Sequence, residues 1–226
     1  MLFLAGHGLQ TPLSAIRWGC SRLGKLARAK LTTQERKLLD GIQTQAKALS
    51  GMVQALLLVA KVEDGMYKPR EQEIFLRDFL VSFTPLRELA GGKTPRITCP
   101  KDLLLRADRG VLEAVVHAVA VILQPAVSAG HPLRLLATAI GGECRITCSP
   151  AIEFSFLREE TDLDDDSPHL VGGVPGLMLS IASSLSAFLG GSIEAEKHEK
   201  NTHKLLLRLP LHSAVAAPKR EPSLVL

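Results

Sequence analysis

The sequence has few cysteines, and their spacing excludes the usual roles of a cysteine framework. Cys20, Cys99, Cys144 and Cys148 form no metal-ligand pattern. If Cys144 and Cys148 share a strand, they lie about 13 Å apart along it, which is too far for a disulfide. We therefore expect all four cysteines to be reduced, as in a cytosolic protein.

Long apolar runs and a strong excess of one charge are also missing. No run approaches the roughly 20 apolar residues of a membrane span, and no signal peptide is visible. We therefore expect no membrane span in this chain and a cytoplasmic location, alone or as the cytoplasmic part of a larger or membrane-associated protein. The net charge of +4 permits an acidic partner but does not call for nucleic acid, and we expect none.

The sequence contains enough apolar residues to bury a core. In the first part of the chain these residues recur with a helical period. Hydrophobic residues make up 46% of the chain and charged residues 22%. The first apolar stripe steps by four and three residues, at Leu2, Gly6, Leu9, Leu13, Ile16, Cys20, Leu23 and Ala27. A second stripe has the same steps, at Leu39, Ile42, Ala46, Leu49, Val53, Leu56 and Ala60. Both are typical of the seam of a helical bundle.

These stripes predict two long helices joined by a short turn. The first runs to about residue 29, and the second ends at about Glu63, before Asp64 and Gly65. Thr32 and Glu35 have the spacing of a capping box at the start of the second helix. An antiparallel hairpin leaves each stripe half covered, so we expect a homodimer that completes a four-helix bundle.

One histidine stands out on the first helix. His7 lies one position off the apolar stripe, so we expect its imidazole to point out beside the packed seam. Pro12 follows within the helix, where a proline loses a backbone hydrogen bond at a cost of roughly 3 kcal/mol and bends the helix. From these residues alone, a surface histidine on a bent helix and a functional histidine remain equally open.

The pattern changes after residue 70 to short strands interleaved with helices. We expect strands at residues 74–76, 96–99, 103–106, 133–140, 144–148, 152–156, 192–196 and 203–209. We expect helices ending near residue 89, from 109 to about 123 with Asp108 as its cap, and from 177 to 189. The fold class is α+β: a helical hairpin at residues 1–66, an α/β sandwich with a mixed sheet at 71–211, and a disordered tail at 212–226.

The first helix carries a resemblance to a known family. His7-Gly8-Leu9-Gln10-Thr11-Pro12-Leu13-Ser14-Ala15-Ile16 resembles the H-box of sensor histidine kinases, H-E-[LI]-[RK]-T-P-L-x-x-I, with Gly8 in place of the acidic residue. The segment from Leu56 to Gly65 resembles the family pattern that closes the second helix. The resemblance implies that His7 is the phosphoacceptor, and that Thr11 stands where family phosphatases orient a water molecule. It also implies a response regulator receiver domain as partner, which the basic residues Arg17, Arg22, Lys25 and Arg28 would meet.

The second half resembles the ATPase domain of the same family. Residues 108–116 look like the start of its N-box helix, 176–182 like its second glycine box, and 189–193 with 205–211 like its closing hairpin. The resemblance implies ATP and Mg²⁺ as cofactors. Gly173, Gly176 and Leu177 would then be the remnant of a nucleotide-binding loop.

Several positions depart from that ATPase pattern. Ile122, or Val121 if the register slips by one, stands where an asparagine would coordinate Mg²⁺, and Ala118 lies one turn earlier. The strand near Ser149 lacks the expected D-x-G-x-G, and Met178 replaces a glycine. Residues 159–166, where a lid would cover the nucleotide, contain six acids, which would repel a triphosphate.

Three functions remain open from the sequence. The first is a histidine kinase that moves a phosphoryl group from ATP to His7 and then to a response regulator aspartate, although Gly8 offers no general base. The second is a pseudokinase that acts as an ATP-independent histidine phosphotransferase, a phosphatase or a regulatory dimer scaffold. The third is a structural dimerisation module without phosphoryl chemistry.

Overall fold

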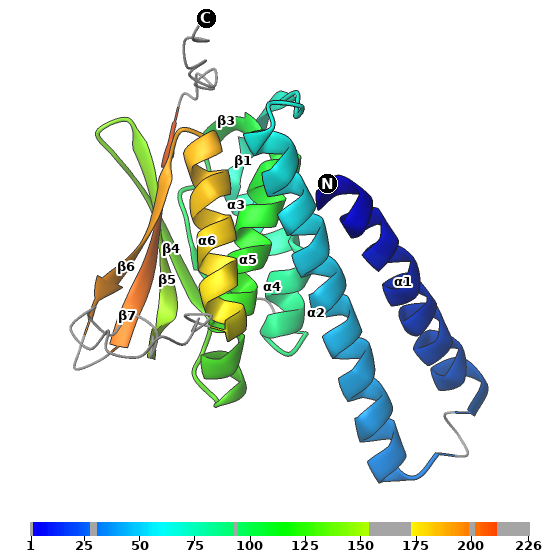
Figure 1. Ribbon diagram of the computed structural model, residues 1–226. Helices are drawn as coiled ribbons and strands as arrows, with labels where there is room; N and C mark the ends of the chain where they lie inside the picture. The colour runs from blue at the N-terminus through cyan, green and yellow to red at the C-terminus, as the bar shows by residue number, and fades with distance from the viewer. Residues whose placement is uncertain (1, 28–30, 93–94, 154–172, 199–201, 212–226) are drawn as a thin grey trace, which may run out of the picture. The chain divides into compact units, whose positions relative to one another are not determined.

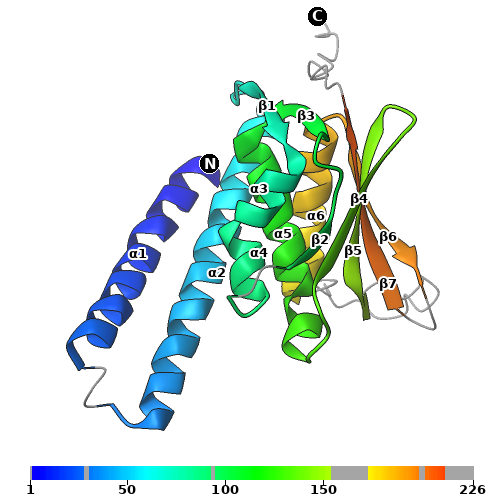
Figure 2. The same ribbon diagram turned by 180° about the vertical axis from the view of Figure 1, so that it is seen from behind.

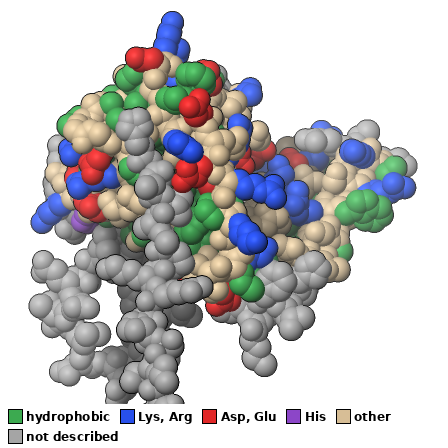
Figure 3. Space-filling view, turned by 90° about the horizontal axis from the view of Figure 1, so that it is seen from above, with side chains coloured by type: hydrophobic (Ala, Val, Ile, Leu, Met, Phe, Trp, Pro, Cys, Tyr) green, Lys and Arg blue, Asp and Glu red, His purple; other side chains and the backbone are tan. Residues whose placement is uncertain are grey.

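The computed structural model describes residues 2–27, 31–92, 95–153, 173–198 and 202–211. The expected acidic lid at 159–166 and the expected tail at 212–226 lie outside these ranges. The chain forms two compact units, residues 1–67 and 68–226, which are described separately below. On the face viewed in Figure 3, basic side chains are interspersed with acidic and apolar ones.

The first unit is a pair of helices, α1 (Leu2–Ala27) and α2 (Thr33–Glu63), which pack against each other as the predicted hairpin (Figure 1). The predicted capping box is confirmed. The Thr32 N–H donates to the Glu35 carboxylate at 2.7 Å, and the Glu35 N–H donates to the Thr32 hydroxyl at 3.2 Å. Two orphan donors at the start of α2 are thereby satisfied.

The second helix ends at the residue that the sequence predicted. Asp64 is the C-cap, and Gly65 adopts φ +66°, a conformation that glycine reaches without a Cβ clash. The N–H groups of Met66 and Tyr67 both donate to the Lys61 carbonyl, at 2.9 and 3.0 Å. The last carbonyls of α2 therefore have partners as the chain leaves the helix.

Within one chain, the two apolar stripes are only partly buried. The buried members are Leu13 and Cys20 on α1 and Ala46 and Val53 on α2. The members between them remain open: Ile16 is 47% exposed, Leu23 56%, Ile42 51%, Leu49 48% and Leu56 41%. We call these five residues the open stripe. The α1–α2 contact thus buries alternate residues of each stripe and leaves the residues between them exposed.

The second unit contains two sheets. β1 (Glu71–Phe75) and β3 (Leu104–Asp108) form an antiparallel pair. The main sheet has the order β2-β4-β5-β7-β6, formed by β2 (Arg96–Thr98), β4 (Arg134–Ile140), β5 (Glu143–Glu153), β7 (Thr202–Pro210) and β6 (Ser192–Lys197). β2 is parallel to β4 and the other pairs are antiparallel, which confirms the predicted mixed sheet.

Four helices cover one face of the main sheet (Figures 1 and 2). They are α3 (Leu76–Ser82), α4 (Thr84–Leu89), α5 (Arg109–Ser128) and α6 (Gly173–Phe188). α5 and α6 pack against each other and bury most of the core of this unit. In the described part of the chain, α5 is the one helix long and apolar enough to cross a membrane, and 56% of its most apolar window is buried inside the protein.

The predicted cap of α5 is confirmed and has a second role. One oxygen of the Asp108 carboxylate accepts the Val111 N–H at 3.0 Å, and the other accepts the Arg70 N–H at 2.7 Å. Asp108 is 3% exposed, so both bonds lie in a desolvated site. The carboxylate therefore joins the start of the second unit to its central helix.

Three local predictions need correction. The helix expected to end near residue 89 is split at Phe83 into α3 and α4, because Pro85 lies at the start of α4 and lacks the N–H that a continuous helix would use. The two strands predicted on either side of Pro100 are both present, and they belong to different sheets.

The other two corrections concern the ends of β5 and α6. β5 does not end at Cys148 but continues through an irregular register to Glu153, and the remainder of the predicted strand at 152–156 lies outside the described residues. α6 begins at Gly173, four residues before the predicted start. All four cysteines are free, as predicted, and burial raises the pKa values of the Cys144 and Cys148 thiols to about 12.

His117 on α5 makes the stability of the second unit depend on pH. Burial lowers its pKa below the ordinary value of 6.5, opposed by the nearby Glu88. The unfolded chain then binds a proton more readily than the folded one, so folding stability is constant above about pH 6.5 and falls at lower pH. We expect His117→Gln to lose less stability than wild type between pH 7.5 and 5.5, measured by urea unfolding. The exposed His131→Gln serves as the matched control, and equal pH slopes for His117→Gln and wild type would contradict the assignment.

Candidate functional site

One face of α1 carries the predicted phosphoacceptor region. His7 lies in α1, and Thr11, Ser14, Trp18 and Ser21 follow it at helical spacings that place them on the same side of the helix. Thr11 is exposed. The face that starts at His7 therefore continues over several turns of side chains that are open to solvent.

A groove lies along this face where α1 meets α2. Its volume is about 620 Å³, and it is lined by Ser14, Arg17, Trp18 and Ser21 of α1 with Gln43 and Lys47 of α2. Trp18 is 66% exposed, and the Arg22 guanidinium lies 5.5 Å from the centre of its ring. A large exposed aromatic beside cations is the composition of a protein-binding surface.

Only part of this groove could be predicted from the sequence. Arg17 was predicted as a partner contact, whereas Trp18 and Lys47 were not. Trp18 could have been found as the single tryptophan of the chain, placed off the apolar stripe where no core needs it. Lys47 could not, because its approach to Trp18 depends on the register between the two helices.

In the second unit, the positions expected to hold Mg²⁺ are part of the packed core. Ala118 and Ile122 of α5 are both fully buried, and so is Met178 of α6, the residue in place of a glycine. Hydrocarbon side chains offer no ligand to a hard cation, which takes oxygen. Val121, the alternative in a shifted register, is also aliphatic. These residues do not fit the Mg²⁺–nucleotide site of an ATPase.

The stretch of β5 around Ser149 lacks the group expected to recognise adenine. Cys148 is 2% exposed, and burial raises the pKa of its thiol to about 12, so it stays protonated and apolar in character. Ser149 is half-buried, and no carboxylate occurs between Cys144 and Ile152. In this stretch nothing replaces the aspartate that would accept a hydrogen bond from the adenine amino group.

The remnant glycine loop forms the first turn of α6. Gly173, Gly176 and Leu177 all lie within the helix, where Leu177 is 41% exposed. Their N–H groups stand at a helix start, but Pro175 contributes none. Within the described residues no cluster of three His, Cys, Asp or Glu side chains could hold a metal ion.

Placing an asparagine at the position where the N-box would coordinate Mg²⁺ should therefore destabilise the fold. We expect Ile122→Asn to lower the free energy of unfolding of the second unit by about 3 kcal/mol or more, because it removes a buried aliphatic side chain and buries an amide. Urea unfolding of the full chain measures the change. Val121→Asn, one residue away and partly exposed, is the matched control, and a loss below about 1 kcal/mol for Ile122→Asn would show that the site is open rather than packed.

The comparison with protein families matches the first unit. Residues 5–65 match the family of the His Kinase A (phospho-acceptor) domain. No curated protein sequence matches the chain.

Solved structures resemble the chain over most of its length. Full-length ShkA in complex with AMPPNP has a TM-score of 0.57 and 20% identity, covering 96% of this chain and 46% of that one. Histidine kinase AdeS of Acinetobacter baumannii has a TM-score of 0.52 and 15% identity, covering 91% of this chain and 98% of that one. This chain thus spans less than half the length of ShkA, and at these identities the likeness establishes the fold. Residues 5–65 therefore match the His Kinase A (phospho-acceptor) domain family, and the chain shares the fold of these histidine kinase structures.

Proposed function

We propose that this protein is a two-component histidine phosphotransfer protein that exchanges a phosphoryl group between His7 and the aspartate of a receiver domain, without turning over ATP. The observation that carries the proposal is the contrast between the two units. The phospho-acceptor domain match includes His7, and a groove on the same unit is open to solvent. The positions for Mg²⁺ in the second unit are fully buried hydrocarbon.

The transfer needs only chemistry that these partners hold. A neutral imidazole nitrogen of His7 attacks the phosphorus of an aspartyl phosphate, the new N–P bond forms, and the P–O bond to the aspartate breaks. The carboxylate leaves without a proton, so the step needs no general acid. The reverse step returns the group to an aspartate. Gly8 weakens a kinase role because it supplies no base, but this exchange starts from an imidazole that is already unprotonated.

The groove between α1 and α2 supports a receiver domain as the partner. Arg17 and Lys47 line it, and Arg22 stacks over Trp18, so the surface offers cations and an apolar anchor together. An acidic receiver surface would match these cations. Charge complementarity would orient the partner so that its aspartate faces His7.

The open stripe supports a homodimer. Five large apolar side chains at heptad spacing stay 41–56% exposed in a single chain, and a second hairpin would cover them in a four-helix bundle. We assign the domains as residues 1–66 for dimerisation and phosphotransfer and 71–211 for the degenerate ATPase-type unit. The four free cysteines support a cytoplasmic location.

A second candidate function is removal of phosphate from the receiver. Thr11 is exposed four residues after His7, so its hydroxyl can reach a phosphoryl group held at the same face. In this reading a water molecule attacks the aspartyl phosphate. A Thr11→Ala variant that keeps phosphotransfer but slows loss of inorganic phosphate would favour it.

Phosphotransfer should depend on His7. We expect the full chain to take up an acid-labile label from receiver domains phosphorylated with labelled acetyl phosphate, and His7→Ala to take up none, because no other nitrogen stands at this position. Labelled protein after an acid and an alkali wash measures the transfer. His131→Ala is the control that should transfer normally, and label retained by His7→Ala would contradict the assignment.

The dimer should depend on the open stripe. We expect the pair of changes Ile42→Asp and Leu49→Asp to weaken self-association by about 100-fold or more, because two carboxylates would be buried at roughly 2 kcal/mol each. Sedimentation velocity over a range of concentrations measures this. Gln54→Asp on the exposed side of α2 adds one carboxylate outside the stripe and should leave the dimer intact, so an unchanged dimer in the double variant would rule out this interface.

Trp18 should anchor the receiver. We expect Trp18→Ala to raise KM for the phosphorylated receiver by about tenfold or more with kcat little changed, since a buried aromatic anchor typically contributes about 2 kcal/mol to binding. Leu26→Ala is the matched control, because Leu26 is 71% exposed on α1 and does not line the groove. A fall in kcat without a change in KM would show that Trp18 acts on the chemistry instead.

A further inference from the structure

The main sheet has one edge that is only partly paired. β2 pairs with Arg134 to Leu136 of β4, whereas β4 continues to Ile140. Pro100 follows the end of β2 and has no N–H to extend the ladder. On the β2 side, residues Ala137 to Ile140 have no strand partner within the described part of the chain. Figure 2 shows the short β2 beside the longer β4.

The backbone of this open stretch is oriented for pairing. The Arg96 N–H donates to the Leu133 carbonyl at 3.2 Å, so odd-numbered residues of β4 direct their polar groups toward the β2 side. By this alternation, the N–H and C=O of Ala139 face the open edge. Ala139 is exposed, although Ala137 on the same face of the strand is buried.

The two edges of the sheet differ in how they are protected. β6, at the far edge, carries exposed Glu194, Glu196 and Lys197, and charges on an edge strand prevent pairing with another chain. The open stretch of β4 reads Ala-Thr-Ala-Ile and carries no charge. Only the β4 edge is therefore suited to accept a further strand.

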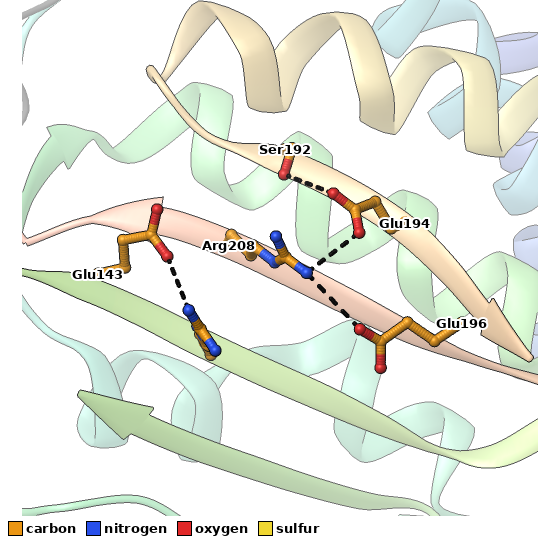
Figure 4. A network of polar contacts seen from close by, with 6 residues as sticks. Glu143, Ser192, Glu194, Glu196 and Arg208 are labelled. Carbon is orange, nitrogen blue, oxygen red and sulfur yellow. Dashed lines mark hydrogen bonds and ion pairs between the residues drawn. The ribbon is translucent and has the colours of Figure 1, made fainter. Parts of the chain in front are cut away.

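The charges on the outer face of the sheet are unevenly balanced. Near β6, Arg208 contacts Glu194 at 3.2 Å and Glu196 at 3.6 Å, and the neighbouring Arg145 contacts Glu143 at 3.5 Å (Figure 4). Arg145 and Arg208 are directly opposite each other, and these carboxylates offset their repulsion.

Near the open edge, two arginines also lie opposite each other, but no carboxylate contacts them in the described part of the chain. Arg96 and Arg134 are direct register partners, both are exposed, and neither has an ion pair within the described residues. Like charges directly opposite each other destabilise a strand pair. On the same face, Leu136 is 46% exposed and Ile140 51%. An unbalanced arginine pair therefore adjoins an uncovered apolar strip and an unpaired edge.

We propose that this edge is a docking site for an extended acidic segment of a partner protein, which adds as a strand beside Ala137 to Ile140. Its main chain pairs with Ala139, an apolar side chain covers Ile140, and the residues that flank this strand pass over the outer face beyond β2, where their carboxylates reach Arg96 and Arg134. The site lies in the second unit and is independent of phosphotransfer at His7. It gives the degenerate ATPase-type unit a binding role that needs no nucleotide.

The test uses the full chain and a defined probe, a fluorescent octapeptide that alternates Glu with Val and Thr. We expect saturable binding, a loss of at least tenfold in affinity for Arg96→Glu with Arg134→Glu, and slowed amide exchange at Ala139. Ala139→Pro should abolish binding without unfolding the chain, because its N–H faces the edge and is not used inside the sheet. Arg87→Glu, an exposed charge reversal on α4, is the control and should bind normally.

Each other outcome overturns the proposal. Absence of saturable binding removes the site. Binding that survives Ala139→Pro would rule out strand addition. Equal binding of a peptide with Lys in place of each Glu would rule out the acidic preference. Equal or tighter binding of a thymidine oligonucleotide of the same charge would assign the arginine pair to phosphate instead. Transfer to His7 is assayed in parallel, so a failure here is separate from a failure of the phosphotransfer proposal.

Discussion

The structure of the first unit depends on which residues of the two apolar stripes pack between α1 and α2. Alternate steps of the seam, at Leu13, Cys20, Ala46 and Val53, close the hairpin, and the open stripe is left uncovered. The burial inside one chain is small because two of these residues are Ala and Cys, so a hairpin alone gains little apolar stabilisation. In the proposed dimer, a partner hairpin would cover the open stripe. The seam also leaves a face of α1 exposed, along which Ser14, Trp18 and Ser21 line the groove.

The second unit keeps the fold of an ATPase domain with a different use of its central helices. Asp108 still caps α5 and joins it to the start of the unit, and α5 still packs on α6. Yet Ala118, Ile122 and Met178 fill with hydrocarbon the positions where a nucleotide and its cation would need oxygen ligands and close backbone approach. The layers of this unit are held together by burial of these side chains and need no ligand.

The sequence predicted the features that depend on local chemistry. The capping box at Thr32, the helix end at Gly65, the cap at Asp108 and the β4–β5 and β6–β7 hairpins all follow from spacing within a few residues. Features that depend on distant residues were missed. The continuation of β5 past Pro150 is set by its pairing with β7, whereas the break at Phe83 was missed although Pro85 signals it locally. The approach of Lys47 to Trp18 and the opposition of Arg96 and Arg134 likewise require the register between elements. The roles of His7 and Thr11 rest on the family resemblance, and the structure adds the groove beside them.

The most direct measurement of the central claim is calorimetric titration of the purified dimer with Mg²⁺–ATP, followed by incubation with γ-labelled ATP. If the second unit has lost its nucleotide site, no heat of binding should appear even at millimolar ATP, and His7 should acquire no label from ATP while it still accepts label from a phosphorylated receiver. Saturable binding of Mg²⁺–ATP together with label that His7→Ala abolishes would contradict the account and establish a kinase whose nucleotide site is built from other residues.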